Sequence, residues 1–146
     1  MVVMKAAILF ESLTGNTRKA SELIAGNLQQ EGWSVTGVCP VRQPEMAAIQ
    51  DADMVIVGTW VHGLFVVGQS PWGIGAINGL PFLRGKKAAT FCTYALNPAK
   101  SLDRLGSAVS RLGAEVIGGC ALHRAKLHEH TEEFVARLLA ATPVSA

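Results

Sequence analysis

The sequence has few charged residues for its length. Only 16% of its 146 residues are Asp, Glu, Lys or Arg, whereas 49% are hydrophobic; an ordinary soluble domain carries about 25% charged residues. This combination excludes an intrinsically disordered chain, which requires low hydrophobicity and high charge. The length suits one domain spanning residues 1–146. So apolar a chain requires segments buried on both faces, as in a parallel sheet covered by helices.

Long hydrophobic runs and paired cysteines are also missing. No stretch reaches the roughly 18 uncharged apolar residues of a membrane span, and the N-terminus lacks the basic region and cleavage site of a signal peptide. Three cysteines are present without CxxC spacing: Cys39, Cys92 and Cys120. We therefore expect a cytoplasmic protein with buried, reduced thiols and no membrane association.

The sequence also lacks a strong excess of acidic or basic residues. The net charge is +2, made up of −2 over residues 1–80 and +4 over residues 81–146. The basic residues Arg84, Lys86 and Lys87 are expected to form a solvated strand start, and we predict no nucleic-acid partner. His128 and His130 are two residues apart and do not share a helix face, so we predict no metal site.

Short apolar runs alternate with segments of helical period. We expect strands at residues 5–10, 33–39, 54–57, 86–92 and 115–122. Helices are expected at residues 16–30, 44–50, 98–112 and 131–141, with a short one near 71–78. This order predicts an open parallel α/β sheet with helices on both faces. Ligands of such sheets bind at the carboxyl ends of the strands, which directs attention to residues 11–17, 58–70 and 92–98.

The first of these loops is rich in hydrogen-bond donors. Ser12, Thr14 and Thr17 supply hydroxyls, Asn16 supplies an amide, and Gly15 allows the backbone to curl before a helix start. Such a loop suits a terminal phosphate, although a helix-capping loop has a similar composition. The sequence has no GxxxxGK[ST] motif and no GxGxxG after the first strand. The third strand is followed by Gly58-Thr59 instead of the acidic residue of a phosphorylation receiver.

The segment Ser12-Leu13-Thr14-Gly15-Asn16-Thr17 resembles the [ST]-x-T-G-x-T phosphate motif of flavodoxins. The resemblance covers the whole chain and is greatest to short-chain members. It implies a flavodoxin-like three-layer sandwich with a five-stranded parallel sheet of order 2-1-3-4-5, an order for which flavodoxin is itself a standard example. It also implies non-covalent FMN, whose phosphate is held by hydroxyls and backbone amides without Lys or Arg.

The same resemblance assigns flavin contacts to the other two loops. They comprise Thr59, Trp60, Val61, His62 and Gly63, and Thr93, Tyr94, Ala95, Leu96 and Asn97. Trp60 and Tyr94 would flank the isoalloxazine ring, although each is also consistent with packing against the protein. Gly63 would permit a backbone flip near flavin N5. The frequent Gly-Asp pair of the third loop is absent, so Thr93 to Asn97 would meet the ring edge through backbone groups.

The resemblance implies a one-electron carrier that cycles between neutral semiquinone and anionic hydroquinone, without a catalytic side chain. It would be a monomer that receives electrons from a reductase and passes them to a partner protein. An alternative is an FMN-dependent oxidoreductase such as a quinone or protoporphyrinogen reductase. The pI near 8.6 favours this alternative, because flavodoxin carriers are usually acidic. A flavin-free regulatory or binding domain is the third possibility.

Overall fold

The computed structural model describes residues 4–11, 15–62, 70–71, 77, 79–80, 83–95 and 101–142. Strands and helices alternate along the described chain except between β3 and α4, where β3, β4 and β5 follow one another. The strands are β1 (Lys5–Phe10), β2 (Ser34–Pro40), β3 (Met54–His62), β4 (Ser70–Pro71), β5 (Lys87–Tyr94) and β6 (Glu115–His123). The helices are α1 (Asn16–Gln30), α2 (Met46–Asp51), α4 (Ser101–Ser110), the 3₁₀ turn η1 (Arg124–Lys126) and α5 (Leu127–Ala141).

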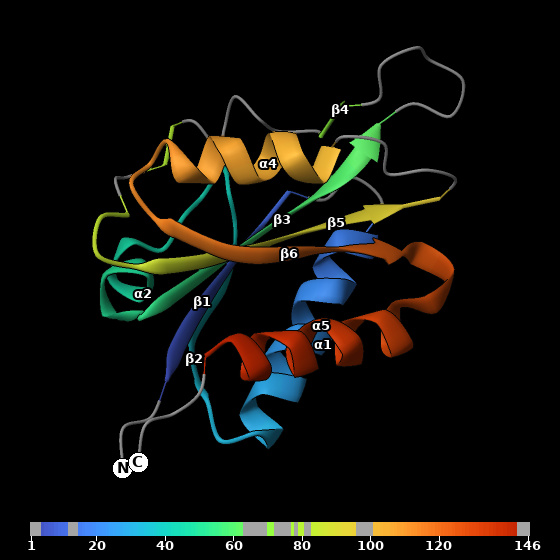
Figure 1. Cartoon of the computed structure of the whole chain (residues 1–146), viewed down its shortest axis with the longest axis horizontal. Coiled ribbons are helices and arrows are strands. Elements are labelled where there is room, and N and C mark those ends of the chain that lie inside the picture. The colour runs from blue at the N-terminus through green and yellow to red at the C-terminus, as the bar shows by residue number, and fades with distance from the viewer. Residues whose placement is uncertain are drawn as a thin grey trace.

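The main sheet is parallel, with strand order β2-β1-β3-β5-β6 (Figure 1). This is the predicted order 2-1-3-4-5, which is confirmed. The alternating strand β2 lies at an edge and the apolar strand β3 at the centre, as their sequences predict. One addition was not foreseen: the two-residue strand β4 pairs antiparallel with the end of β3.

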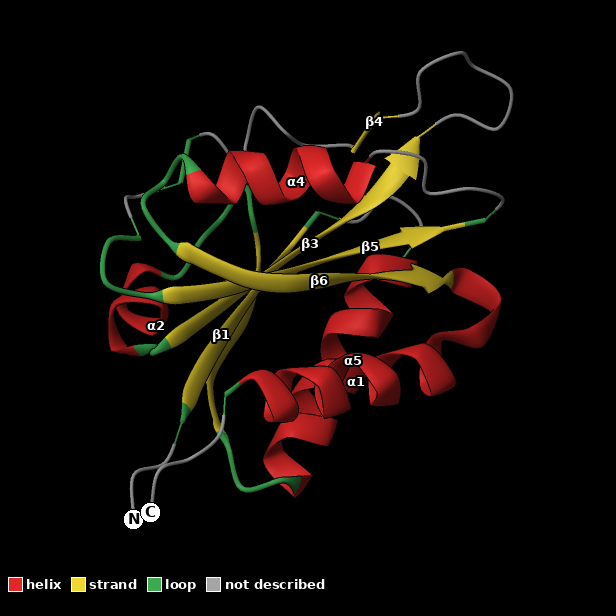
Figure 2. Ribbon diagram, viewed as in Figure 1, coloured by secondary structure: helices red, strands yellow, loops and turns green. Residues whose placement is uncertain are grey.

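Helices cover both faces of the sheet (Figure 2). Helices α1 and α5 pack together on one face, over a core that includes Ile8, Phe91 and Phe134. Helices α2 and α4 lie on the other face, over a core that includes Leu9 and Val57. Because successive strand side chains point to opposite faces, both cores draw on the same strands, which explains the high apolar content. Within the described residues, no helix is long and apolar enough to cross a membrane.

The largest differences from the predicted element boundaries are at the start of α5 and at the end of β3, and the other boundaries shift by at most two residues among the described positions. Helix α5 begins at Leu127 instead of Thr131, and its first-turn acidic residue is Glu129. Strand β3 continues beyond Val57 to His62, so that residues predicted to lie in a loop belong to the strand. The extension pairs with β5 as far as Trp60 and with β4 at Val61 and His62.

The short helix predicted near residues 71–78 cannot begin at its first residue. Pro71 lies in β4, where it pairs with Val61. Ile77 is helical and buried, and the remaining residues of that range lie outside the described part of the chain.

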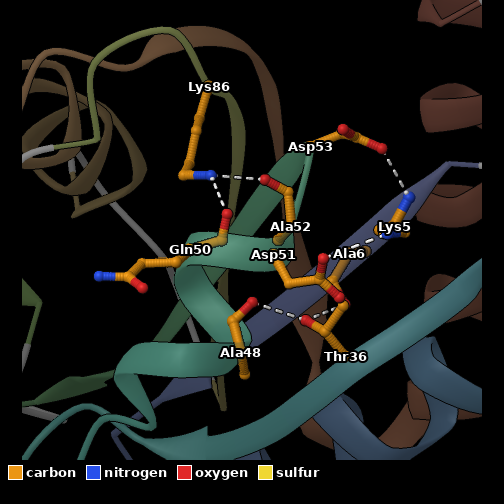
Figure 3. Close-up of polar contacts among 9 residues, drawn as sticks. All are labelled: Lys5, Ala6, Thr36, Ala48, Gln50, Asp51, Ala52, Asp53 and Lys86. Atoms are coloured by element: carbon orange, nitrogen blue, oxygen red, sulfur yellow. Dashed lines mark hydrogen bonds and ion pairs between the residues drawn. The ribbon is translucent and has the colours of Figure 1, made fainter.

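Polar contacts hold the amino ends of the strands (Figure 3). The backbone N–H of Lys5 donates to Asp53 Oδ2 at 3.0 Å, and Lys5 Nζ forms an ion pair with Asp51 at 3.1 Å. The hydroxyl of Thr36 donates to the carbonyl of Ala48 at 2.8 Å, which joins β2 to α2. These contacts are at the end of the sheet opposite the one where a ligand of this fold binds.

Candidate cofactor site

The three segments selected from the sequence, residues 11–17, 58–70 and 92–98, begin side by side toward the carboxyl edge of the sheet. Gly58 of β3 is in register with Phe10 of β1 on one side and with Phe91 of β5 on the other. The backbone N–H of Glu11, the first residue after β1, donates to the carbonyl of Gly58 at 2.9 Å. The parallel register therefore brings these strand ends together, as predicted.

The head of α1 lies at this edge and suits an anion. Gly15 is the N-cap residue and has φ of 91°, a left-handed conformation that favours glycine. Its carbonyl accepts the N–H of Lys19 at 2.8 Å, which starts the helix. No acidic residue lies in the first turn of α1, so no carboxylate offsets the partial positive charge of the helix start. The predicted phosphate-loop residues Ser12, Leu13 and Thr14 lie outside the described residues.

A buried hydroxyl pair joins this helix to the sheet. Thr17 in the first turn of α1 and Thr93 near the end of β5 have their Oγ1 atoms 2.9 Å apart. Their exposed fractions are 1% and 3%. Thr93 is in register with Trp60 on one neighbouring strand and with Leu122 on the other, so its backbone lies within the sheet. The pair connects the first and third predicted loops.

The two candidate aromatic residues are next to each other at the strand ends. Trp60 is in register with Thr93, and Tyr94 is the following residue of β5. Because strand side chains alternate, Trp60 and Tyr94 leave the sheet toward opposite faces. Both side chains are half-buried. This placement suits residues that flank a flat ring lying across the strand ends.

The remaining predicted residues are divided between described and undescribed positions. Thr59 is fully buried, and Asn16 and Ala95 are half-buried. Val61 and His62 pair with β4 through the backbone of β3. The other three predicted contacts lie outside the described residues: Gly63, Leu96 and Asn97.

The structure adds His123, which the sequence analysis did not include in the site. Its ring meets that of Tyr94 edge-on, with centroids 5.1 Å apart and an interplanar angle of 79°. The N–H of Ala125 donates to His123 Nδ1 at 3.1 Å, and the N–H of His123 donates to His130 Nδ1 at 2.9 Å. Its position at the end of the strand next to β5 was the available signal. Among the described residues, no group of three His, Cys, Asp or Glu could hold a metal ion.

Charges beside the head of α1 are largely compensated. The carboxylate of Glu11 accepts from Arg42 Nε at 3.0 Å through both oxygens. The guanidinium of Arg18 lies 5.1 Å from the ring centroid of Phe10, within cation–π range. The one acidic side chain that immediately follows β1 is thus neutralised by a partner, and the helix start keeps its preference for an anion.

The thiol nearest the site is unreactive. Cys92 is buried beside Thr93 on β5, and burial, with a smaller contribution from Cys120, raises the pKa of its thiol to about 12. Burial also raises the pKa of Cys39 and Cys120. All three are free cysteines, as predicted. A thiol that stays protonated at neutral pH is a poor nucleophile, so Cys92 does not supply one to the site.

Comparisons with known proteins identify the family and the fold. The family model of the flavodoxin domain matches residues 7–119. The structure is similar to that of a Streptococcus pneumoniae TIGR4 flavodoxin, with a TM-score of 0.71 and 23% identity, covering 94% of this chain and 99% of the other. It is also similar to oxidised flavodoxin 1 of Bacillus cereus, with a TM-score of 0.69 and 23% identity, covering 97% and 99% of the two chains. The search of curated proteins gives no match.

Proposed function

The chain belongs to the flavodoxin domain family, and we propose that it is a one-electron carrier that holds FMN non-covalently at the carboxyl edge of its sheet. The observation that carries the proposal is the meeting of the head of α1 with the ends of β3 and β5. We assign the phosphate and the flat ring of the cofactor to different parts of that edge. Bound FMN supplies the redox chemistry, by accepting and donating electrons singly.

The donor groups fit the phosphate end of FMN. Gly15 caps α1 in a left-handed backbone conformation that favours glycine. A Cβ built there meets no described atom within 4 Å. Thr17 adds a hydroxyl in the first turn, and no carboxylate of that turn opposes an anion. We assign phosphate binding to Gly15, Asn16 and Thr17 together with the preceding segment Ser12-Leu13-Thr14.

The side chains of Trp60 and Tyr94 suit the isoalloxazine ring of FMN. Trp60 and Tyr94 bring flat, polarisable faces to adjacent strand ends, and we assign them to the two sides of the isoalloxazine. Rings on both sides exclude water and disfavour charge on the reduced cofactor. His123 supports Tyr94 from β6 through the edge-on contact described above. The polypeptide thus binds the cofactor and adjusts its potential.

A carrier of this kind depends on other proteins for both halves of its cycle. We propose a reductase as the electron donor and a second protein as the acceptor, with this chain acting as a cytoplasmic monomer. None of the described thiols has the lowered pKa of a redox-active cysteine. Electron transfer through a bound flavin is consistent with that chemistry.

Flavin uptake tests the proposal directly. The purified protein is titrated with FMN, and quenching of flavin fluorescence reports the bound fraction. We expect saturation at one FMN per chain and a yellow protein after gel filtration. A protein that stays colourless and leaves FMN fluorescence unchanged would instead support the flavin-free regulatory or binding domain.

A second candidate is an FMN-dependent oxidoreductase on the same fold, such as a quinone or protoporphyrinogen reductase. The observation that favours it is the sequence pI near 8.6, which lacks the acidity usual for a carrier. The two candidates differ in how they are reduced. Two separate one-electron steps in a stepwise titration support the carrier, whereas rapid oxidation of a nicotinamide by the protein alone supports the enzyme.

A further inference from the structure

The hydroxyl pair between Thr17 and Thr93 joins positions 76 residues apart in the sequence. Thr17 belongs to the segment assigned to the phosphate, whereas Thr93 belongs to the strand that carries Tyr94. Both side chains are almost completely buried. A hydrogen bond in such a dry setting is stronger than one in water, and its direction matters for any group that depends on either hydroxyl.

The number of protons restricts that direction. Each threonine hydroxyl has one proton to donate and can accept two hydrogen bonds. A phosphate group of FMN is mainly an acceptor, so Thr17 can bind it only by donating its single proton. Thr17 then has no proton left for Thr93. The 2.9 Å contact is kept only if Thr93 donates and Thr17 accepts.

We propose that Thr93 is a positioning residue for the cofactor phosphate, and this inference rests on the proposed function. Thr93 donates its hydroxyl proton to Thr17 Oγ1, which directs the only proton of Thr17 toward the phosphate. A hydroxyl that accepts one hydrogen bond is polarised and donates more strongly in the next. Thr93 therefore acts on the phosphate through Thr17, without touching it.

The surroundings of Thr93 hold its hydroxyl in a fixed position relative to Thr17. Its backbone is held between β3 and β6, whereas Thr17 is at the start of a helix. The hydroxyl of Ser21 is already used by the carbonyl of Thr17, at 2.9 Å. On the same face of β5 as Thr93, the ring of Phe91 packs against that of Phe134, with centroids 6.0 Å apart. A Thr93→Val substitution keeps the branched shape of the side chain and removes its hydroxyl.

The experiment compares FMN with riboflavin, which has the same ring but no phosphate. Dissociation constants for both are measured by fluorescence quenching with wild type, Thr93→Val and Thr93→Ser. We expect Thr93→Val to weaken FMN binding roughly three- to tenfold, the range for one lost hydrogen bond. Riboflavin binding should change by less than about twofold on the same scale, and Thr93→Ser should restore FMN binding.

Thr90→Val is the matched control, because Thr90 is a buried threonine of the same strand on the opposite face. It should leave the ratio of FMN to riboflavin affinity unchanged. If Thr93→Val folds poorly, as judged by its melting temperature, Thr93→Ala provides the same comparison with a smaller side chain. Equal losses for the two ligands, or no loss for either, would overturn the role of Thr93.

The outcomes also separate this inference from the proposed function. A wild-type protein that binds riboflavin as tightly as FMN binds flavin without using the phosphate, which overturns the inference alone. A wild-type protein that binds neither ligand overturns both. Tight FMN binding together with a selective loss in Thr93→Val supports both.

Discussion

Gly58 occupies a position of β3 where no other side chain fits. A Cβ built there would lie 2.0 Å from Cζ of Phe91, whose ring covers the glycine from the neighbouring strand. Phe91 is itself fully buried and contacts Phe134 of α5, so it cannot move aside without disturbing the core. The contact explains why the central strand contains a glycine next to the candidate site.

Substituting Gly58 with alanine should therefore destabilise the protein. We expect a loss of about 2–4 kcal/mol in the free energy of unfolding, measured by urea denaturation, since overpacking forces neighbouring groups apart. Gly118→Ala in β6 is the control, because a Cβ there meets no atom within 4 Å. Similar unfolding free energies for the two variants would contradict this account of Gly58.

Burial of the Cys92 thiol makes stability depend on alkaline pH. Its pKa is raised from 9.0, the value of an unperturbed thiol, to about 12 in the folded chain. Below the lower value both states hold the proton, and the contribution to stability is complete. As the pH rises between the two values, the unfolded chain loses its proton while the folded chain keeps it, so stability falls.

The test is a series of urea denaturations from neutral pH to about pH 10.5, within the interval set by these two pKa values. We expect the unfolding free energy of wild type to fall more steeply with pH than that of Cys92→Ala, which has no thiol at this position. Both proteins contain the same tyrosine and lysines, so their difference isolates the thiol. Parallel pH profiles would show that Cys92 does not contribute.

At the scale of elements, the C-terminus of helix α2 is capped by a lysine that precedes strand β5. Lys86 Nζ donates to the carbonyls of Gln50 at 3.0 Å and Ala52 at 2.7 Å, at the end of α2 (Figure 3). A cation at this position satisfies terminal carbonyls and complements the helix dipole. The sequence predicted a solvated strand start for Lys86, and the structure shows that its ammonium caps α2.

Replacing Lys86 with methionine should destabilise the protein by removing the cap of α2. We expect a loss of about 1 kcal/mol in the unfolding free energy, because the carbonyls lose a charged donor on a half-exposed surface. Lys87→Met serves as the control, since Lys87 is an exposed neighbour at the start of β5. A loss of the same size in both variants would indicate a general effect of charge instead of a cap.

The start of α5 shows where a local sequence signal misleads. Thr131 followed by two glutamates is typical of a helix beginning, and this predicted a start four residues too late. In the structure Thr131 lies inside the helix and donates its hydroxyl to the carbonyl of Leu127 at 2.6 Å. Its polar group is satisfied within the helix, so the same residue type fits either position.

At the scale of the molecule, the parallel α/β architecture and the convergence of three loops could be predicted from the order of apolar runs and helical segments. The strand order 2-1-3-4-5 was implied by the resemblance of residues 12–17 to the flavodoxin phosphate motif. The contact between Thr17 and Thr93 could not be predicted, because it depends on how far β5 extends and on how α1 sits against it. The edge-on contact of His123 with Tyr94 depends on strand register in the same way.

Charge is the molecular property that most distinguishes this chain from an acidic carrier. The net charge is +2, and the exposed residues Arg124 and Lys126 directly follow His123 at the edge that carries the candidate site. Positive charge near a bound flavin stabilises its fully reduced anion. We therefore expect the potential of the second one-electron reduction to be less negative than in acidic short-chain flavodoxins, as measured by redox titration.

Charge-reversal variants close to the site and far from it distinguish the effect of nearby charges on this potential from the effect of net charge. Arg124→Glu with Lys126→Glu should lower this potential by tens of millivolts at low salt. Lys87→Glu with Arg111→Glu should lower it less, because both residues are exposed at the amino end of the sheet. Since salt screens exposed charges over about 10 Å at 0.1 M ionic strength, the difference between the variants should shrink as salt is added. Equal shifts for the two pairs would mean that net charge, not its position near Tyr94, sets the potential.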